Sequence, residues 1–179
     1  AHKQKRKQPG EKHPSVRRTY HALTPHKASE WLRQLCAPDP SPQSTKIVPS
    51  AEQRAFLQRV VGRCLQECVD EGEDTMPRSE PMHFMLHGMP GAGKSQTLLW
   101  VREFFEKVCE FTHGLEFVFL ASQNTMAALI EGTTLHSFGD IQFMKKDGSK
   151  ANVRKNGDVP DMSKLFLRYE RLRWIFVDE

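Results

Sequence analysis

The feature of the sequence that most constrains the fold is the glycine-rich octapeptide GMPGAGKS at residues 88–95. It matches the pattern G-x-x-x-x-G-K-[S/T] at every fixed position. An apolar run, MHFMLH at 82–87, ends directly before the octapeptide, and apolar residues at helical spacing follow it over 96–109. A buried strand, a glycine-rich turn and a helix in this order are typical of a parallel α/β sheet with helices on both faces.

The residue types of the octapeptide suit the binding of nucleotide phosphates. Its glycines permit backbone conformations that other residues avoid, so that consecutive N–H groups can turn toward an anion. Lys94 can place its ammonium near the β- and γ-phosphates as a catalytic group, and Ser95 can offer a hydroxyl to Mg²⁺. The helix that follows adds the positive end of its dipole. A turn without a ligand is the alternative, but four fixed positions at this spacing rarely coincide by chance. ATP and Mg²⁺ are therefore the predicted cofactors, and the predicted cofactor-binding residues of this segment are Gly88, Gly91, Ala92, Gly93, Lys94, Ser95 and Gln96.

A second group of candidate residues ends the chain, in the segment WIFVDE at 174–179. The pattern predicts a buried strand with Asp178 and Glu179 at its carboxyl end, the edge where parallel α/β sheets bind ligands. Asp178 can hold Mg²⁺ opposite Ser95, and Glu179 can orient and deprotonate a water molecule as the catalytic base. A plain strand end is the alternative for these two acids. With the phosphate-binding motif upstream, the pair favours a hydrolase.

The remaining pattern alternates helices with strands. Ser50 and Gln53 form a capping-box pattern before an amphipathic helix over 51–69. Further elements are predicted as short helices over 28–36 and 125–130, a buried strand over 116–121, a polar surface insertion over 140–162 and a helix over 165–172. The sequence thus predicts a P-loop NTPase (RecA-like) domain over 48–179, a parallel sheet flanked by helices, which is incomplete at its C-terminal end.

The N-terminal part differs from the rest in charge. Residues 1–27 hold eight Lys and Arg against one acid, a net charge of +7, whereas the whole chain carries +4, so that the remainder nets −3. We therefore expect a basic, Pro-rich disordered arm and linker over 1–47. Such an arm is a solvated tail, an import signal or a nucleic-acid contact.

Composition excludes several classes of protein. No run of 18 apolar residues occurs, so that no membrane-spanning helix is predicted, and the N-terminus lacks the apolar core of a signal peptide. The four cysteines indicate reduced thiols of an intracellular protein. Cys64 and Cys68, one helical turn apart, favour core thiols over a zinc site. Both termini look cut, so we expect this chain to be part of a longer polypeptide.

Residues 117–141, FVFLASQNTMAALIEGTTLHSFGDI, resemble the segment after the phosphate loop in PIF-type DNA helicases, relatives of RecD within superfamily 1. In that family a strand ends in an alanine-containing stretch and is followed by Ala-Ala, a glycine and Thr-(aliphatic)-His-Ser-Phe. The matching residues here are Ala121, Ala127, Ala128, Gly132 and Thr134, Leu135, His136, Ser137 and Phe138. The resemblance covers about 50–179. It departs from the family at 123–126, where Gln-Asn-Thr-Met replaces the usual Thr-Gly before the paired alanines.

The resemblance implies an ATP-dependent DNA helicase that acts on single-stranded DNA and duplex junctions, in repair, recombination or telomere maintenance. It implies that Gln53 reads the adenine edge and that Thr134, His136 and Ser137 contact the sugar-phosphate backbone. The alternatives are a capping-box role for Gln53, a turn cap for Thr134 and Ser137, and a structural histidine at 136. Phe138 is either a core residue or a platform for a base.

The same resemblance implies an arginine finger from a second RecA-like domain, so that these 179 residues alone would hydrolyse ATP slowly or not at all. A monomer located in the nucleus or the mitochondrion is expected. Two other functions remain open, namely an AAA+ type remodeller and a degenerate helicase domain retained as a nucleic-acid or protein-binding module. The presence of Lys94, Ser95, Asp178 and Glu179 together favours an enzyme over the degenerate domain.

Overall fold

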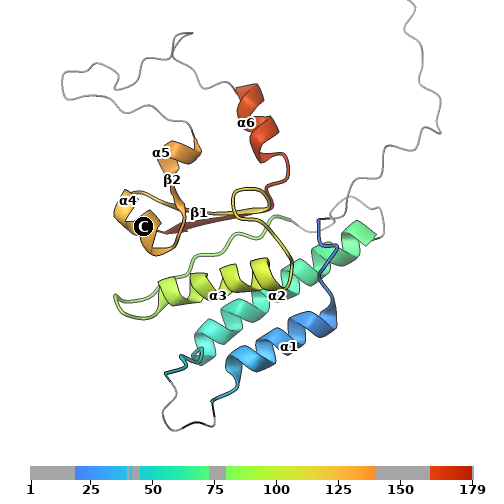
Figure 1. The fold of residues 1–179 in the computed structure, drawn as a ribbon, viewed down its shortest axis with the longest axis vertical. Coiled ribbons are helices and arrows are strands. Elements are labelled where there is room, and N and C mark those ends of the chain that lie inside the picture. The colour runs from blue at the N-terminus through green and yellow to red at the C-terminus, as the bar shows by residue number, and fades with distance from the viewer. Residues whose placement is uncertain (1–18, 40, 42–44, 73–79, 140–161, 179) are drawn as a thin grey trace, which may run out of the picture.

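The computed structural model describes residues 19–39, 41, 45–72, 80–139 and 162–178. This part of the chain is a mixed α/β fold in which a three-stranded parallel sheet is flanked by helices (Figure 1). Its elements are, in chain order, α1 (Pro25–Cys36), α2 (Ala51–Gly72), α3 (Lys94–Lys107), β1 (Phe117–Ala121), α4 (Asn124–Leu129), β2 (Thr133–Thr134), α5 (Leu135–Phe138), α6 (Met162–Tyr169) and β3 (Trp174–Asp178). The predictions of an α/β fold and of a parallel sheet are thereby confirmed.

The sheet has the strand order β2-β1-β3. Strand β1 pairs with β3 along its whole length, from Phe117 opposite Trp174 to Ala121 opposite Asp178. The pairing of β1 with β2 is shorter and joins Ala121 to Thr134. Because all three strands are parallel, Ala121, Thr134 and Asp178 lie together at one edge of the sheet.

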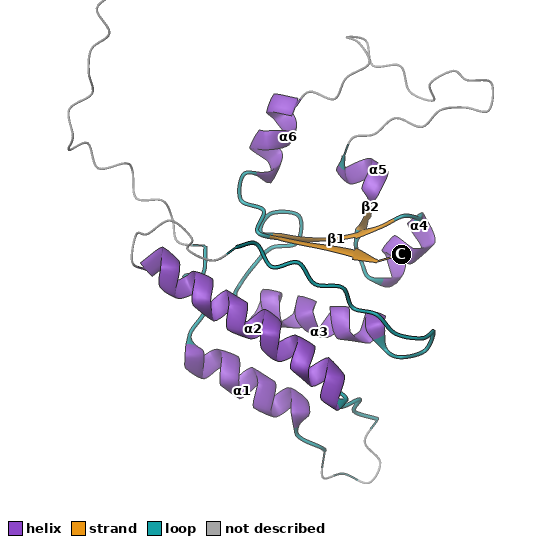
Figure 2. Ribbon diagram, turned by 180° about the vertical axis from the view of Figure 1, so that it is seen from behind, coloured by secondary structure: helices purple, strands orange, loops and turns teal. Residues whose placement is uncertain are grey.

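Helices α1, α2 and α3 lie on one side of the sheet, and α5 and α6 lie on the other (Figures 1 and 2). Aromatic rings join the sheet to α3, with Phe105 at 5.1 Å from Phe117 and at 5.4 Å from Trp174 between ring centroids. Complete burial of a side chain of this size contributes about 2 to 3 kcal/mol. The stacking of α3 against the sheet is therefore a main source of stability.

The helix predicted over 28–36 is present as α1. Residues 19–36 belong to the folded body, however, so that the prediction of a disordered arm over 1–47 is wrong for them. Tyr20 is only 2% exposed, and Leu23 and Trp31 are also buried. Trp31 packs on Phe104 of α3 at 5.0 Å between ring centroids. Seven of the eight basic residues that suggested an arm lie within 1–18, whereas apolar side chains of the segment that follows reach the core. The part of the arm over 1–18 lies outside the described residues.

A hydrogen-bond network around Tyr20 ties this N-terminal segment to α2 and β3. The Tyr20 hydroxyl donates to Oε2 of Glu67 at 2.6 Å and accepts from Nε1 of Trp174 at 2.9 Å. The backbone amides of Thr19 and Tyr20 both donate to Oε2 of Glu71. Burial raises the pKa of Tyr20, so that its hydroxyl stays protonated and keeps its proton for Glu67.

The predicted buried strand over 82–87 is a second correction. Residues 80–89 have no regular secondary structure and run between the sheet and the α2–α3 layer (Figure 2). Among the described residues no strand pairs with them, and Met85 is 84% exposed. The ring of Phe84 lies 5.0 Å from Phe56 of α2, with the Arg59 guanidinium 5.4 Å away. An apolar run becomes a strand only beside a partner strand, and here its side chains pack on a helix instead.

None of the helices in the described part of the chain combines the length and the apolar character needed to cross a bilayer. Cys64 is completely buried in the core and Cys68 packs against it, as core thiols do. Nearly all of the predicted surface insertion over 140–162 lies outside the described residues.

Candidate phosphate-binding site

The loop over 88–95 leads directly into α3. Gly91 and Gly93 have φ angles of +81° and +78°, a region that side-chain-bearing residues rarely adopt. The amide of Ala92 donates to the carbonyl of Met89 at 3.0 Å and closes the turn. Gly93 is the N-cap residue of α3 and has no side chain to cap it, so the first amides of the helix are left for another acceptor. Two of the three motif glycines, Gly91 and Gly93, thus adopt a backbone conformation that other residues avoid.

Lys94 folds back over this loop. Its Nζ donates to the carbonyl oxygen of Gly88 at 2.7 Å and lies 3.4 Å from that of Met89. The ammonium is thus held at the start of the loop rather than extended into solvent. A cation in this position lies within the span of the loop, where it can meet an anion bound to the loop amides.

Gln53 contacts the loop from the first turn of α2. Its side-chain Oε1 accepts from the backbone amide of Ser50 at 2.8 Å, and the backbone amide of Gln53 donates to Oγ of Ser50 at 3.2 Å. This reciprocal pair confirms the capping box. In addition, Nε2 of Gln53 donates to the carbonyl oxygens of Ala92 at 3.3 Å and Gly93 at 3.2 Å. The sequence did not predict this second contact, which joins residues about forty positions apart.

The acidic edge of the sheet lies at the same end of the molecule as the loop (Figures 1 and 2). Asp178 ends β3 opposite Ala121 and is partly buried, and Ser95 is exposed at the start of α3. Glu179 lies outside the described residues.

The described residues contain no group of three or more His, Cys, Asp or Glu side chains that could hold a metal. Mg²⁺ does not need such a group, because it commonly keeps several water molecules and takes only one or two protein oxygens together with substrate phosphates. One hydroxyl from Ser95 and one carboxylate from Asp178 fit that requirement.

The segment predicted to contact DNA forms β2 and α5. Thr134 is the N-cap residue of α5, and its Oγ1 accepts from the Ser137 amide at 3.2 Å. The ring of Phe138 lies 4.3 Å from that of Tyr169, whose hydroxyl donates to the Phe138 carbonyl at 2.8 Å. The capping role considered for Thr134 is thus present, and Phe138 packs against α6. The side chain of Ser137 is exposed and that of His136 is partly buried.

Gly132 supports the position of this segment beside β1. A Cβ atom at residue 132 would lie 2.4 Å from the carbonyl oxygen of Phe119, closer than any real contact. Only glycine fits here without moving the backbone. The close approach to Phe119 therefore gives a steric reason for the glycine at position 132.

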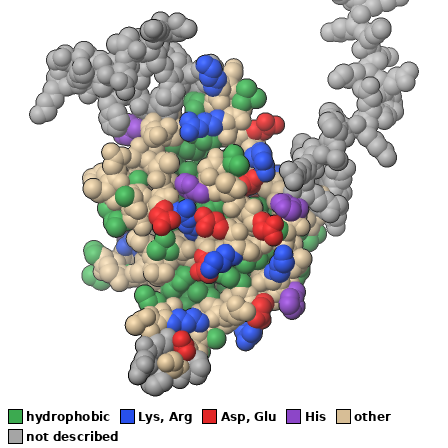
Figure 3. Space-filling view, viewed as in Figure 1, with side chains coloured by type: hydrophobic (Ala, Val, Ile, Leu, Met, Phe, Trp, Pro, Cys, Tyr) green, Lys and Arg blue, Asp and Glu red, His purple; other side chains and the backbone are tan. Residues whose placement is uncertain are grey.

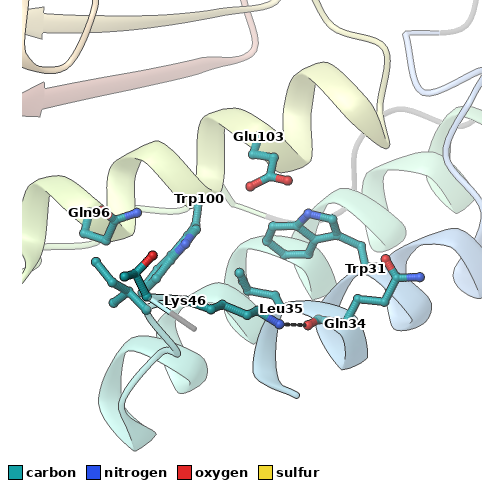
Figure 4. Close-up of a pocket in the computed structure, with 9 residues that line it drawn as sticks. Trp31, Gln34, Leu35, Lys46, Gln96, Trp100 and Glu103 are labelled. Atoms are coloured by element: carbon teal, nitrogen blue, oxygen red, sulfur yellow. Dashed lines mark hydrogen bonds between the residues drawn. The ribbon is translucent and has the colours of Figure 1, made fainter. Parts of the chain in front are cut away.

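A cavity of about 430 Å³ lies between α1, residues 45–47 and α3 (Figure 4). Trp31 and Trp100 are among its lining residues, and Nζ of Lys46, which also lines it, donates to the Gln34 carbonyl at 2.7 Å. The side chain of Gln96, a predicted cofactor-binding residue, also lines it. The sequence could not predict this cavity because it depends on the packing of α1 on α3.

Charged side chains of both signs are interspersed on the face of the molecule seen in Figure 3. Over the described residues of this face, lysine and arginine do not gather into one basic tract. The strongest basic tract of the sequence, KQKRK at 3–7, lies outside the described residues.

No protein-family model matches the chain, and no curated protein and no solved structure matches it. The resemblance to PIF-type helicases therefore depends on the residues quoted above.

Proposed function

We propose that this chain is the ATP-binding part of a DNA helicase motor, with a RecA-like P-loop fold. The observation that carries the proposal is the 88–95 loop, with Gly91 and Gly93 at positive φ, Lys94 folded over it and α3 starting directly behind it. The position of Asp178 at the carboxyl edge of a parallel sheet supports the same function.

In this proposal the amides of the loop and of the first turn of α3 bind the ATP phosphates, and Lys94 contacts the β- and γ-phosphates. Ser95 and Asp178 hold Mg²⁺, which neutralises phosphate charge when bound. Glu179 orients the attacking water and takes its proton. Oxygen attacks the γ-phosphorus in line, the bond to the β–γ bridging oxygen breaks, and ADP and phosphate leave.

The DNA part of the proposal concerns the opposite side of the sheet from α3. Thr134 and Ser137, together with His136, would contact the backbone of single-stranded DNA, which gives binding without sequence preference. The pairing of Ala121 with both Thr134 and Asp178 supports a link between the two sites, since one strand joins them. A second RecA-like domain would supply the arginine finger and close on the nucleotide.

Nucleotide binding by the 179-residue chain is the first test. We expect calorimetric titration with ATP and Mg²⁺ to show binding that Lys94→Ala weakens at least about 10-fold, because a charged hydrogen bond is lost. Lys107→Ala is the matched control, since Lys107 ends the same helix and pairs with Glu103 at 2.8 Å. Equal affinity in the Lys94 variant and the wild type would sink the proposed site.

The second test measures ATP hydrolysis, with and without single-stranded DNA, by a protein that also carries the second core domain. Stimulation by DNA that disappears in Lys94→Ala supports a helicase motor. Hydrolysis that needs Lys94 but ignores DNA points to another P-loop ATPase, such as an AAA+ remodeller. DNA binding without any hydrolysis points to a degenerate helicase domain.

A further inference from the structure

The side-chain amide of Gln53 makes hydrogen bonds through both its oxygen and its nitrogen. Its oxygen accepts from the Ser50 amide, and its nitrogen donates to the carbonyls of Ala92 and Gly93. We infer that Gln53 is a positioning residue that orients the phosphate-binding amides of the loop, rather than a reader of the adenine base. The inference rests on the proposed function and assigns Gln53 a different role in that same site from the one implied by the helicase resemblance.

The geometry of the peptide bond carries the inference. In a trans peptide the C=O and the N–H of one plane point in opposite directions, and the described residues contain no cis peptide bond. When the carbonyls of Ala92 and Gly93 point at Gln53, the amides of Gly93 and Lys94 must point away from it, into the loop. These two amides are the donors that an anion at the start of α3 would meet. Gln53 therefore helps to fix the direction of both donors. At the Gly93 carbonyl it acts together with the amide and the hydroxyl of Thr97, which donate to the same oxygen at 3.0 Å and 2.9 Å.

Gln53 is itself held by a rigid part of the molecule. The capping box fixes it on the first turn of α2, and that helix is anchored in the core by buried Phe56 and Leu57. The loop by contrast contains three glycines, whose backbone has wide conformational freedom. A rigid amide that binds a glycine-rich loop lowers the entropy that the loop would lose on binding phosphate.

The side-chain amide of Gln53 closely approaches Gly93, so that a side chain at residue 93 would displace it from the loop. A Cβ atom at residue 93 would lie 2.7 Å from Nε2 of Gln53, in addition to the strain of its φ of +78°. Contact with the glutamine and the shape of the loop thus depend on the same glycine. This supports a functional pairing of the two residues.

Because the amide already makes three hydrogen bonds, it cannot read a base edge without breaking some of them. The inference therefore predicts that loss of Gln53 weakens all ligands that carry the phosphates, whatever the base. The experiment compares ATP, GTP and inorganic pyrophosphate, each with Mg²⁺, by calorimetric titration of the 179-residue chain. Gln53→Met has nearly the same size as the native residue but has no amide.

We expect Gln53→Met to weaken all three ligands by a common factor of about 10, because two hydrogen bonds to the loop are lost. Gln58→Met is the matched control, since it makes the same substitution at an exposed position of the same helix. This control should bind the three ligands as the wild type does. Thermal unfolding followed by circular dichroism checks that both variants are folded at the titration temperature.

The outcomes separate this inference from the proposed function. Weaker binding of ATP alone, with GTP and pyrophosphate unchanged, overturns the inference and restores the adenine-reading role. Equal binding of all three ligands by wild type and Gln53→Met also overturns it, while the proposed function stands. A wild-type chain that binds none of the three overturns both.

Discussion

The backbone amide of Phe119, in the middle of β1, donates a hydrogen bond to Nε2 of His113 at 3.1 Å. This bond requires a neutral imidazole with Nε2 as the acceptor. Burial, with the positive charge of Arg102 as the second cause, lowers the pKa of His113. The central strand of the sheet is thus tied to an imidazole whose pKa is lowered from its ordinary value.

A pH dependence of stability follows from this bond. The folded-state pKa of His113 lies below its unfolded value of about 6.5. At pH values between the two, the unfolded chain binds more protons than the folded chain. The contribution of His113 to stability is therefore complete above about pH 6.5 and is lost as the pH falls toward the lower folded-state pKa. Urea unfolding between pH 5 and about pH 7.5 measures it. His113→Gln, which offers an acceptor that does not titrate, should flatten the curve, and an unchanged slope in this variant would contradict the assignment.

Gly132 provides a second prediction. Gly132→Ala places a Cβ atom against the Phe119 carbonyl and should lower the free energy of unfolding by about 2 kcal/mol or more through overpacking. Gly62→Ala is the matched control, because nothing lies within 4 Å of a Cβ atom at that position on α2. The control should be neutral or stabilising by up to about 1 kcal/mol, since alanine favours helix. Similar urea midpoints for both variants would show that the close approach is not as tight as described.

The hydroxyl of Tyr20 provides a third prediction. Tyr20→Phe keeps the ring contact with Phe111 but leaves Nε1 of Trp174 without its acceptor and Oε2 of Glu67 without the donor that Tyr20 supplies. We expect a loss of about 1 to 3 kcal/mol in the free energy of unfolding, the usual effect of an unsatisfied buried group. Tyr169→Phe loses one hydroxyl bond at a less buried site and should cost less. If the two variants unfold at the same urea concentration, the network around Tyr20 contributes no more to stability than the single hydrogen bond of Tyr169.

A fourth prediction concerns the cap of α5. Thr134→Val removes the oxygen that accepts from the Ser137 amide and should destabilise this turn by about 1 kcal/mol, whereas Thr134→Ser keeps the cap. Hydrogen exchange of the Ser137 amide, measured by NMR, reports the local loss directly. Faster exchange in the valine variant alone is expected. Equal exchange rates in the wild type and both variants would show that the cap does not protect this amide.

The parts of the fold that depend on local chemistry were predictable. The capping box of Ser50 and Gln53 marks the start of α2 at Ala51, and the glycine-rich motif marks the start of α3 at Lys94, two residues before the predicted start. Strands β1 and β3 follow from short apolar runs bounded by polar residues, but β3 is not buried as predicted, since Ile175 and Val177 are 54% and 56% exposed. Each of these signals acts over a few residues, so the sequence alone carries them.

The features that depend on distant partners were not predictable. The run at 82–87 has the composition of a strand but no strand pairs with it among the described residues. Tyr20 and Trp31 lie within the segment predicted as an arm, and only the positions of Trp174 and Phe104 reveal them as core residues. The contact of Gln53 with Gly93 likewise joins elements that only tertiary packing brings together.

The burial of Tyr20, Leu23 and Trp31 has a practical consequence for anyone who expresses this domain. A polypeptide trimmed to the predicted boundary at residue 48 would lose α1. Phe104 would then lack the ring of Trp31, and Trp174 would lack the Tyr20 hydroxyl as hydrogen-bond acceptor. Exposed aromatic surface of this kind promotes aggregation. Poor solubility of such a shortened version would then reflect a missing piece of the core and would not be a property of the glycine-rich loop.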